Sequence, residues 1–259
     1  MKRPHDDFPD TSRIATAKAI LCDLDGCLIC GDRVLPGIPA FIAQHRDRLW
    51  IVSNNSTDTP ESLSLRLERL GIAVSAQRII LAGAETLRRL AHVEPAPAIA
   101  LHAAPVMAAF AEGIGLRLTN ANPDTVVLCR DTGMTYASLA RALRQLQAGA
   151  RLVVANPDTC HPSAEGDAVP ETGALLAAIH AVLPDHPFES LGKPAPTLFD
   201  IALARAGLRA SEAVMIGDND ATDGHGARAL GIPFILVDPA RGAAAIMERA
   251  ATATERTSC

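Results

Sequence analysis

The stretch Ala19-Ile20-Leu21-Cys22-Asp23-Leu24-Asp25-Gly26 decides the fold of this 259-residue chain. Its first four residues are apolar, and a run of this length is typical of a short strand that is buried on both faces. Two aspartates and a glycine follow at once. Because alternate residues of an extended chain point the same way, the carboxylates of Asp23 and Asp25 can face one site beyond the strand. The sequence Asp-Leu-Asp-Gly also suits a plain turn, so it indicates a site only in company with other motifs.

Short apolar runs alternate with longer amphipathic segments along the rest of the chain. Runs rich in branched residues predict further strands at 49–52, 126–128, 152–154, 214–216 and 234–237. Apolar stripes bounded by Pro and Gly predict helices at 60–70, 139–146, 175–183, 196–206 and 227–230, and an alanine-rich segment predicts a terminal helix at 240–253. This alternation predicts an α/β fold built on a parallel sheet.

The composition narrows the function classes. Hydrophobic residues make up 48% of the chain and charged residues 20%, which supports a hydrophobic core. A net charge of -5 and only 3% aromatic residues argue against a nucleic-acid partner. The sequence has no long apolar run and no apolar leader near Met1, so we expect no membrane partner and a cytoplasmic location. The six cysteines include a single C-x-x-C pair, Cys27 and Cys30, which favours reduced thiols over a zinc site.

Three more polar loops follow predicted strands or open predicted helices. The loop at 53–57 carries hydroxyl and amide side chains that can hold phosphate oxygens near a helix start. Lys193 stands between a glycine and a proline, which stiffen its backbone and allow close approach. The loop at 217–223 gathers three aspartates, of which Asp218 is the best candidate metal ligand because it comes first after the strand.

In this order, the acid pair, hydroxyl loop, lysine and acid cluster resemble the four motifs of the haloacid dehalogenase-like superfamily. The segments 149–158 and 171–175 resemble the α/β cap of its NagD-like, p-nitrophenylphosphatase-type subfamily. The resemblance runs from about Lys18 to Asp238. It implies a Rossmann-like parallel-sheet core, with helices on both faces, formed by residues 1–82 and 188–259, and an inserted α/β cap at 83–187 that selects the substrate.

The resemblance also implies an activity, that of a magnesium-dependent phosphatase acting on small phosphate monoesters. Asp23 would be the nucleophile that forms an aspartyl-phosphate, and Asp25 the general acid and base. Mg²⁺ would be held by Asp23, Asp218 and the backbone carbonyl of Asp25.

The remaining core motifs imply supporting roles around the phosphate. Ser53, Asn54 and Lys193 would bind the phosphoryl oxygens. Asn219 and Asp223 would support Lys193 or the metal's water ligands from behind.

The cap is expected to bring substrate-facing residues over this site. Our candidates are Asn156, Asp158 and Thr172, although Asn-Pro-Asp is also a good turn. Four further polar cap residues could reach a leaving group, namely Arg130, Asp131, His161 and Glu165.

Other functions stay open at this point. A phosphomutase of the same fold would carry the same motifs, whereas a dehalogenase would need neither Asp25 nor Asp218. A non-catalytic binding protein would be expected to have lost one of the four motifs, and all four are intact. The sequence does not choose among sugar phosphates, nucleoside monophosphates, phosphoglycolate and pyridoxal phosphate, and it leaves open a homodimer formed through the cap.

Overall fold

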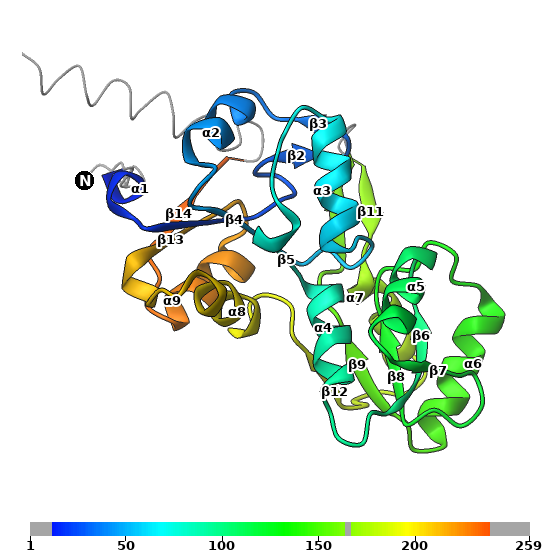
Figure 1. Ribbon diagram of the computed structural model, residues 1–259. Helices are drawn as coiled ribbons and strands as arrows, with labels where there is room; N and C mark the ends of the chain where they lie inside the picture. Colours follow the sequence, from blue (N-terminus) through cyan, green and yellow to red (C-terminus); the bar gives the residue numbers. More distant parts are fainter. Residues whose placement is uncertain (1–11, 164–166, 239–259) are drawn as a thin grey trace, which may run out of the picture.

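The computed structural model describes residues 12–163 and 167–238. They form two lobes, each built on a five-stranded sheet with helices on both faces (Figure 1). We call them the core and the cap. The predicted helix at 240–253 and the candidate Glu165 lie outside the described residues.

The core sheet has the strand order β14-β13-β1-β4-β5, and all of its pairings are parallel. Every residue of the inner strands β1, β4 and β13 and of the edge strand β5 is buried. This burial on both faces explains why their sequences are continuously apolar rather than alternating. The strands are β1 (Ala19–Cys22), β4 (Leu49–Ser53), β5 (Ile79–Leu81), β13 (Ala213–Gly217) and β14 (Phe234–Leu236).

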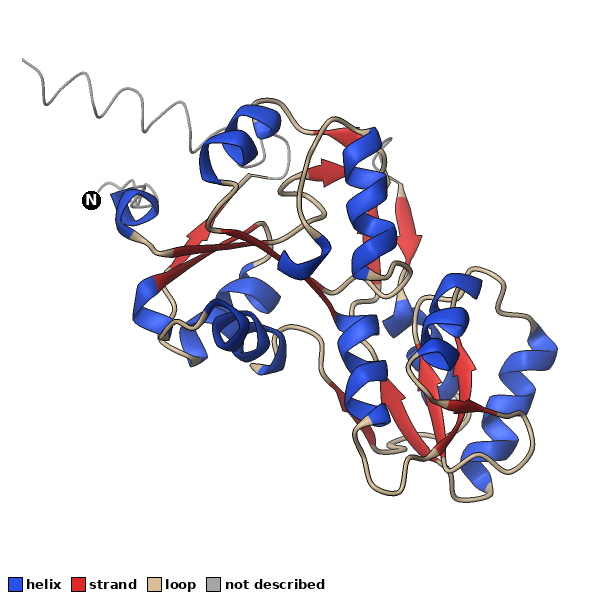
Figure 2. Ribbon diagram, in the orientation of Figure 1, coloured by secondary structure: helices blue, strands red, loops and turns tan. Residues whose placement is uncertain are grey.

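Helices cover both faces of the core sheet (Figure 2). One face packs on α2 (Ile38–His45) and α3 (Pro60–Arg69), and the other on α8 (Thr197–Ala206) and α9 (His225–Ala229). Helix α3 begins with a capping box, in which the Thr59 side chain accepts from the backbone N–H of Ser62. The short helix α1 (Ser12–Thr16) and the 3₁₀ turns Ala76–Arg78 and Ala210–Glu212 lie near the strand starts.

The cap sheet has the order β12-β9-β8-β6-β7 and is also parallel throughout. Its strands are β6 (Ala98–His102), β7 (Arg117–Leu118), β8 (Thr125–Leu128), β9 (Arg151–Val154) and β12 (Phe188–Ser190). Helices α6 (Tyr136–Gln147) and α7 (Thr172–His180) cover one face, and α4 (Ala82–Ala91) and α5 (Pro105–Gly113) the other. Because β12 pairs with β9, residues 188–190 are part of the cap sheet, and the chain returns to the core a few residues later than the predicted boundary at 188.

Two short antiparallel hairpins lie where the lobes meet. The first, β2 (Ile29–Cys30) with β3 (Arg33–Val34), belongs to the core, and the second, β10 (Cys160–Pro162) with β11 (Ala168–Pro170), to the cap. They approach each other closely, because the Cys30 Sγ lies 3.6 Å from the Ser163 carbonyl oxygen. Within the described ranges, no helix has the length and apolar character needed to cross a bilayer.

Candidate active site

The site is assembled at the carboxyl edge of the core sheet. Asp23 follows β1, Ser53 ends β4 and Asp218 follows β13, and β1 lies between the other two strands. Since the three strands are parallel, their carboxyl ends meet at one edge, which is where open α/β sheets bind ligands. The structure therefore brings three of the four sequence motifs together through strand topology alone.

Lys193 is the charged centre of this edge. Its side chain is almost fully buried, and its Nζ donates to Asp23 Oδ1 at 2.7 Å, Asp223 Oδ1 at 2.6 Å and the Val52 carbonyl at 2.9 Å. All three ammonium hydrogens are thus in use. Burial alone would lower the pKa of Lys193, but Asp223 and Asp23 raise it above its usual value. Lys193 is therefore a fixed cation that links the nucleophile candidate to Asp223.

The backbone of Lys193 is fixed as firmly as its side chain. Its N–H donates to Asn54 Oδ1 at 2.7 Å, and its carbonyl accepts from Asn54 Nδ2 at 3.0 Å. The preceding Gly192 lies against the cap, where a Cβ would come within 2.7 Å of the Ala155 carbonyl oxygen. The sequence predicts a close approach of the backbone at this loop, and the structure shows that Gly192 packs against the residue that follows β9.

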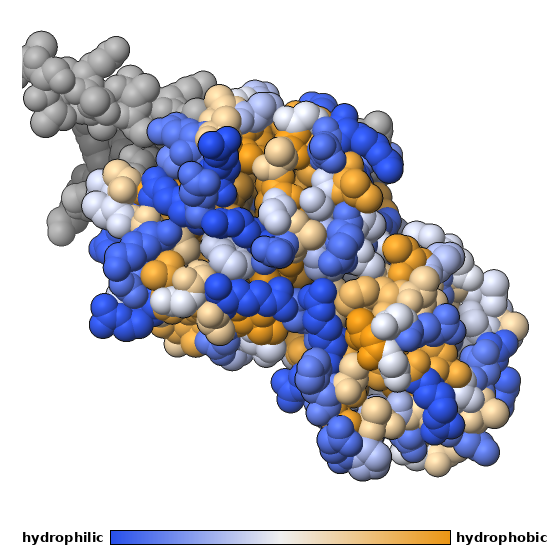
Figure 3. Space-filling view, viewed as in Figure 1, coloured by the Kyte–Doolittle hydropathy of each residue, from blue (hydrophilic) through white to orange (hydrophobic). Residues whose placement is uncertain are grey.

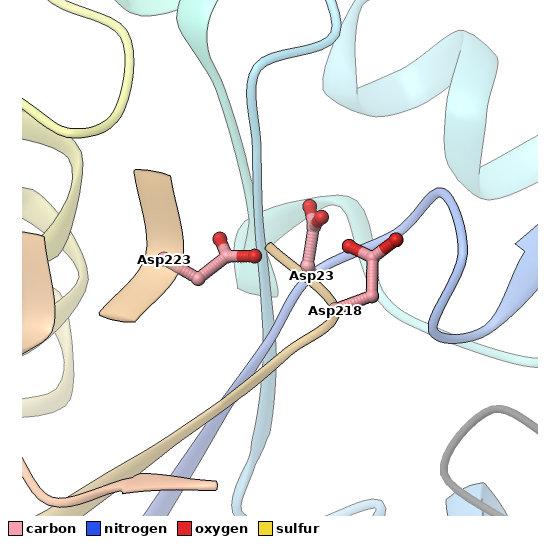
Figure 4. A group of neighbouring side chains, drawn as sticks. All are labelled: Asp23, Asp218 and Asp223. Atoms are coloured by element: carbon pink, nitrogen blue, oxygen red, sulfur yellow. The ribbon is translucent and has the colours of Figure 1, made fainter. Parts of the chain in front are cut away.

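Three carboxylates gather beside Lys193, and Figure 4 shows Asp23 between Asp223 and Asp218. Each offers an oxygen within 4.8 Å of the others. Both oxygens of Asp223 are already engaged, Oδ1 by Lys193 and Oδ2 by the backbone N–H of Asn219 at 3.3 Å, whereas Lys193 occupies only Oδ1 of Asp23. Asp23 and Asp218 are therefore the pair best placed to share a cation.

The residues present fit a magnesium ion. Burial and the neighbouring Asp23 raise the pKa of Asp218 to about 7, which shows that its charge lacks compensation from the protein. Hard oxygen donors of this kind are what Mg²⁺ prefers. Gly26 makes room for them, since it has φ +76° and any Cβ there would collide with the Asp218 carboxylate.

Asp25 lies in the tight turn that follows Asp23. Burial and the charge of Asp23 raise the pKa of Asp25 to about 7. A carboxyl group with such a pKa holds its proton near neutral pH and can then give it up, as a general acid must. The predicted metal contact through the Asp25 backbone carbonyl stays a prediction.

The loop after β4 presents polar groups to the same place. Ser53 is nearly buried, lines the site and accepts from the Asn55 N–H through its Oγ at 3.1 Å. Asn55 in turn accepts from the backbone N–H groups of Thr57 and Asp58, at 3.0 and 2.9 Å. These bonds hold the loop in shape ahead of α3. Asn219 also lines the site, with its side chain capping the following turn at Ala221.

The cap candidates divide into two groups. Asp158 lines the site, and its Oδ2 accepts from Asn54 Nδ2 at 2.9 Å. Asn156 and Thr172 do not line it; their side chains are 1% and 0% exposed. Asn156 donates to the Asn54 carbonyl at 2.7 Å, and the Thr172 hydroxyl lies 3.1 Å from that of Ser56. These two residues fasten the cap to the core loop, in contrast to the substrate-facing role that the sequence suggested.

A cleft of about 770 Å³ lies over the carboxylates, between the core edge and the cap hairpin. Of the other polar cap candidates, Arg130 and His161 line it and Asp131 does not. Sequence reasoning missed Glu171, which lies 2.7 Å from His161 Nδ1 and 3.5 Å from Arg130 Nε. It also missed Arg66 of α3, which binds Asp32 of the β2–β3 hairpin at 2.9 Å. Contacts that form only when these segments pack together leave no local signal in the sequence.

A family model of haloacid dehalogenase-like hydrolases matches residues 17–231. The chain therefore belongs to the haloacid dehalogenase-like hydrolases, which confirms the resemblance carried by its four motifs. Its described fold agrees with that family, since solved members superpose on it over both lobes.

The relatives include several phosphatases. The dihydroxyacetone phosphatase of Corynebacterium glutamicum is 32% identical over 221 residues, which cover 84% of this chain and 79% of that protein. A glycerol phosphate phosphatase from Mycobacterium tuberculosis, solved in complex with magnesium, superposes with a TM-score of 0.77 at 29% identity, over 85% of this chain and 68% of that one. The 4-nitrophenylphosphatase of Thermotoga maritima gives a TM-score of 0.80 at 28% identity, over 86% of this chain and 87% of that one.

Proposed function

We propose that this hydrolase is a magnesium-dependent phosphatase that cleaves small phosphate monoesters through an aspartyl-phosphate on Asp23. The observation that carries the proposal is the position of Asp23. Its Oδ1 lies 2.7 Å from Lys193 Nζ, and its carboxylate offers an oxygen within 4.8 Å of a carboxylate oxygen of Asp218. A carboxylate held beside one fixed cation, and beside a second acid fit for a metal ion, is placed for attack on a phosphate.

The two carboxyl groups of the first motif, Asp23 and Asp25, have different roles in the proposed reaction. Lys193 orients Asp23 through Oδ1, which leaves the second oxygen of Asp23 to attack phosphorus. The bond from phosphorus to the ester oxygen breaks, and Asp25 gives its proton to that leaving oxygen. Asp25, now a carboxylate, then takes a proton from water as the water attacks the aspartyl-phosphate, which releases phosphate and regenerates Asp23.

Other groups balance the charge of the transferred phosphoryl group. Ser53 and Lys193 both line the site; the Ser53 hydroxyl would donate a hydrogen bond to the phosphoryl oxygens, and the Lys193 ammonium would attract them by its positive charge. Asp223 keeps Lys193 in place from behind. Asp23 and Asp218 would hold the magnesium ion, which would supply positive charge to offset the negative charge of the incoming phosphate.

The lining of the cleft favours a small polar leaving group. Arg66, Arg130, His161 and Glu171 surround the space beyond the carboxylates, and none of the described lining residues is Phe, Tyr or Trp. A pyridine ring or a nucleobase would find no Phe, Tyr or Trp ring to stack on there, and the His161 imidazole is held by Glu171. Sugar and polyol phosphates suit such a lining better, and the relatives named for dihydroxyacetone and glycerol phosphate support this choice.

Phosphate release by the purified chain tests the proposal. We expect turnover of dihydroxyacetone phosphate and glycerol 3-phosphate with Mg²⁺, weaker turnover of pyridoxal phosphate and AMP, and none with excess EDTA. Asp23→Asn should lose at least about a thousandfold in kcat, since the nucleophile is gone. Asp220→Asn is the matched control, because Asp220 lies in the same loop as Asp218 but pairs with Arg228 on the surface.

Three outcomes would oppose the proposal. Activity of Asp23→Asn at the parent rate would exclude the aspartyl-phosphate. Phosphate moved within the substrate rather than released would point to a mutase, and halide release from a haloacid to a dehalogenase. The cytoplasmic location and the absence of nucleic-acid and membrane partners stay predictions from composition. A homodimer stays a question for measurement of the mass in solution.

A further inference from the structure

A second pocket, of about 830 Å³, lies in the cap away from the active site. It is lined by the loop at 120–124, the second half of α6 and the turn at 148–151. These segments precede β8 and β9, whereas Arg130 and Asp158 of the active-site cleft follow the same two strands. Because the strands are parallel, the second pocket lies at the opposite edge of the cap sheet.

The charge in this pocket is strongly positive. Three arginines line it, Arg141, Arg144 and Arg151, against a single lining carboxylate, Asp124. The Oδ2 of Asp124 is engaged by the backbone N–H of Ala98 at 2.7 Å. The pocket thus holds an excess of two positive charges in a chain whose net charge is -5.

The arginines are poorly paired within the protein. Arg151 has an acidic neighbour, Glu189, but at 3.7 Å and with both side chains more than half exposed. The guanidinium groups of Arg141 and Arg144 make no hydrogen bond or ion pair with any residue that the structure describes. Like charges that converge without partners repel one another, so the arrangement favours an anion from outside.

The walls of the pocket are held at a fixed spacing. Gln145 of α6 donates from Nε2 to the Asn120 carbonyl at 2.9 Å, and the Arg151 N–H donates to the Asp124 carbonyl at 3.0 Å. Gln145 is 8% exposed, and its Oε1 has no hydrogen-bond partner among the described residues. Because the amide oxygen of Gln145 is an acceptor, it offers an anion nothing, and the features of the pocket that favour an anion are its preformed backbone and its guanidinium groups without partners among the described residues.

We propose that this pocket binds a small-molecule anion that carries phosphate groups. A guanidinium group can donate two parallel hydrogen bonds to two oxygens of one phosphate group. A halide ion is a single atom and cannot accept such a pair of bonds in this geometry. Binding here needs no metal, because the arginines supply the positive charge. The active-site cleft differs, because Asp23, Asp218 and Asp223 gather there and a phosphate would need a metal cation to offset their negative charge. This difference separates the two sites in one experiment.

The test is calorimetric titration of the full chain with inorganic pyrophosphate in excess EDTA. We expect one molecule bound per chain, at the cap pocket. The double variant Arg141→Ala, Arg144→Ala should weaken this binding at least about tenfold, because two charged donors are lost. The matched control is Arg89→Ala, Arg117→Ala, which removes two exposed charges from the cap outside the pocket and should change the affinity less than about twofold, as expected for screened distant charges.

Two results would overturn the proposal. The first is no pyrophosphate binding by the parent chain in EDTA. The second is an equal loss of affinity in both double variants, since that would show only the general effect of net charge. Equal kcat of the parent and both variants on a phosphate ester with Mg²⁺ verifies that the proteins compared are folded. The proposal is independent of the phosphatase assignment, because the titration contains no turnover.

Discussion

Asn54 and Asp158 join the core to the cap, with the Asn54 Nδ2 donating to Asp158 Oδ2 over 2.9 Å. The same Asn54 side chain holds both backbone polar groups of Lys193. The cap is thus connected to Lys193 through the carboxamide of Asn54. Asp158 also lines the cleft. A substitution at Asp158 can therefore alter the position of Lys193 through Asn54, although Asp158 itself does not contact Lys193.

We therefore expect Asp158→Ala to act more on KM than on kcat. Loss of this charge-assisted bond frees Asn54 on its cap side but leaves its pair with Lys193, so KM should rise about tenfold and kcat fall less than about threefold. Asp158→Asn keeps a hydrogen-bond acceptor, so its KM should lie between those of the parent and Asp158→Ala. Steady-state kinetics with dihydroxyacetone phosphate measures both parameters.

Asp131→Ala is the control for this prediction, because Asp131 is a cap aspartate that does not line the cleft. A fall in kcat with no change in KM for Asp158→Ala would contradict the positioning role.

Lys193 should matter for stability as well as for chemistry. Its removal in Lys193→Met leaves Asp23 and the fully buried Asp223 without their shared cation. Breaking a buried ion pair from one side costs about 3–5 kcal/mol of unfolding free energy. Denaturant unfolding in EDTA measures this cost.

An exposed lysine provides the comparison. Lys18 pairs with Glu212 at 2.8 Å but is 66% exposed, so Lys18→Met should cost less than about 1 kcal/mol. Similar costs for the two lysine variants would mean that the buried network is not what holds the edge of the sheet together.

The stability of the metal-free protein should fall as pH rises from about 4 to above 7. Burial and Asp23 raise the pKa of Asp218 to about 7 from 3.8, so the folded state keeps a proton that the unfolded chain has released. Stability from such a group is complete below the unfolded pKa and is lost as pH rises through the folded one. The loss should be on the order of 1–3 kcal/mol.

Unfolding free energies at pH 5 and pH 8 in EDTA check this sign. Asp218→Asn should make the dependence shallower without abolishing it, because burial also raises the pKa values of Asp25 and Asp223 to about 7. Mg²⁺ should restore stability to the parent at pH 8 but not to the variant. A parent protein that becomes more stable between these pH values, with an unchanged slope in Asp218→Asn, would refute the account of an uncompensated carboxylate.

Gly26→Ala should separate backbone strain from damage to the metal site. Gly26 and Gly71 have similar positive φ values, +76° and +81°, so alanine at either position should cost about 1–2 kcal/mol. Only at Gly26 does the new Cβ meet the Asp218 carboxylate, whereas nothing lies within 4 Å at Gly71. Gly26→Ala alone should therefore weaken activation by Mg²⁺, by at least about tenfold, in line with the loss of one ligand's geometry.

The Mg²⁺ concentration for half-maximal activity measures the effect. Equal values for Gly26→Ala and Gly71→Ala would disprove the steric link to Asp218.

Much of the core could be predicted from sequence because its information is local. The strands at 19–22, 49–52 and 214–216 are continuous apolar runs, and each leads directly into a polar loop. Parallel pairing then brings the ends of these strands together without further signal. The α/β fold and the family were predicted for this reason, and both are confirmed.

Elements with weak local patterns were missed. Strand β6 reads Ala-Ile-Ala-Leu-His, in which the alanines suit a helix as well as a strand, and only its place between β8 and β7 settles the matter. Helix α4 starts immediately after β5, so no turn residue separates the two. Strand β12 is three residues long and largely exposed, which is why the cap boundary was placed too early.

The roles of Asn156 and Thr172 show the same limit within the site. The sequence predicts that both face the substrate, but their buried hydrogen bonds to the Asn54 carbonyl and the Ser56 hydroxyl connect segments about a hundred residues apart. A local motif predicts that a polar group is needed, whereas only the packed structure shows which way it points.

The most direct test of the central claim is to stop the reaction during turnover and locate the phosphoryl group by mass spectrometry of the digested protein. The account predicts a phosphoryl group on Asp23, present with Mg²⁺ and substrate and absent in EDTA. A phosphoryl group on Ser53, or steady turnover with unmodified Asp23 under conditions that preserve acyl phosphates, would contradict it.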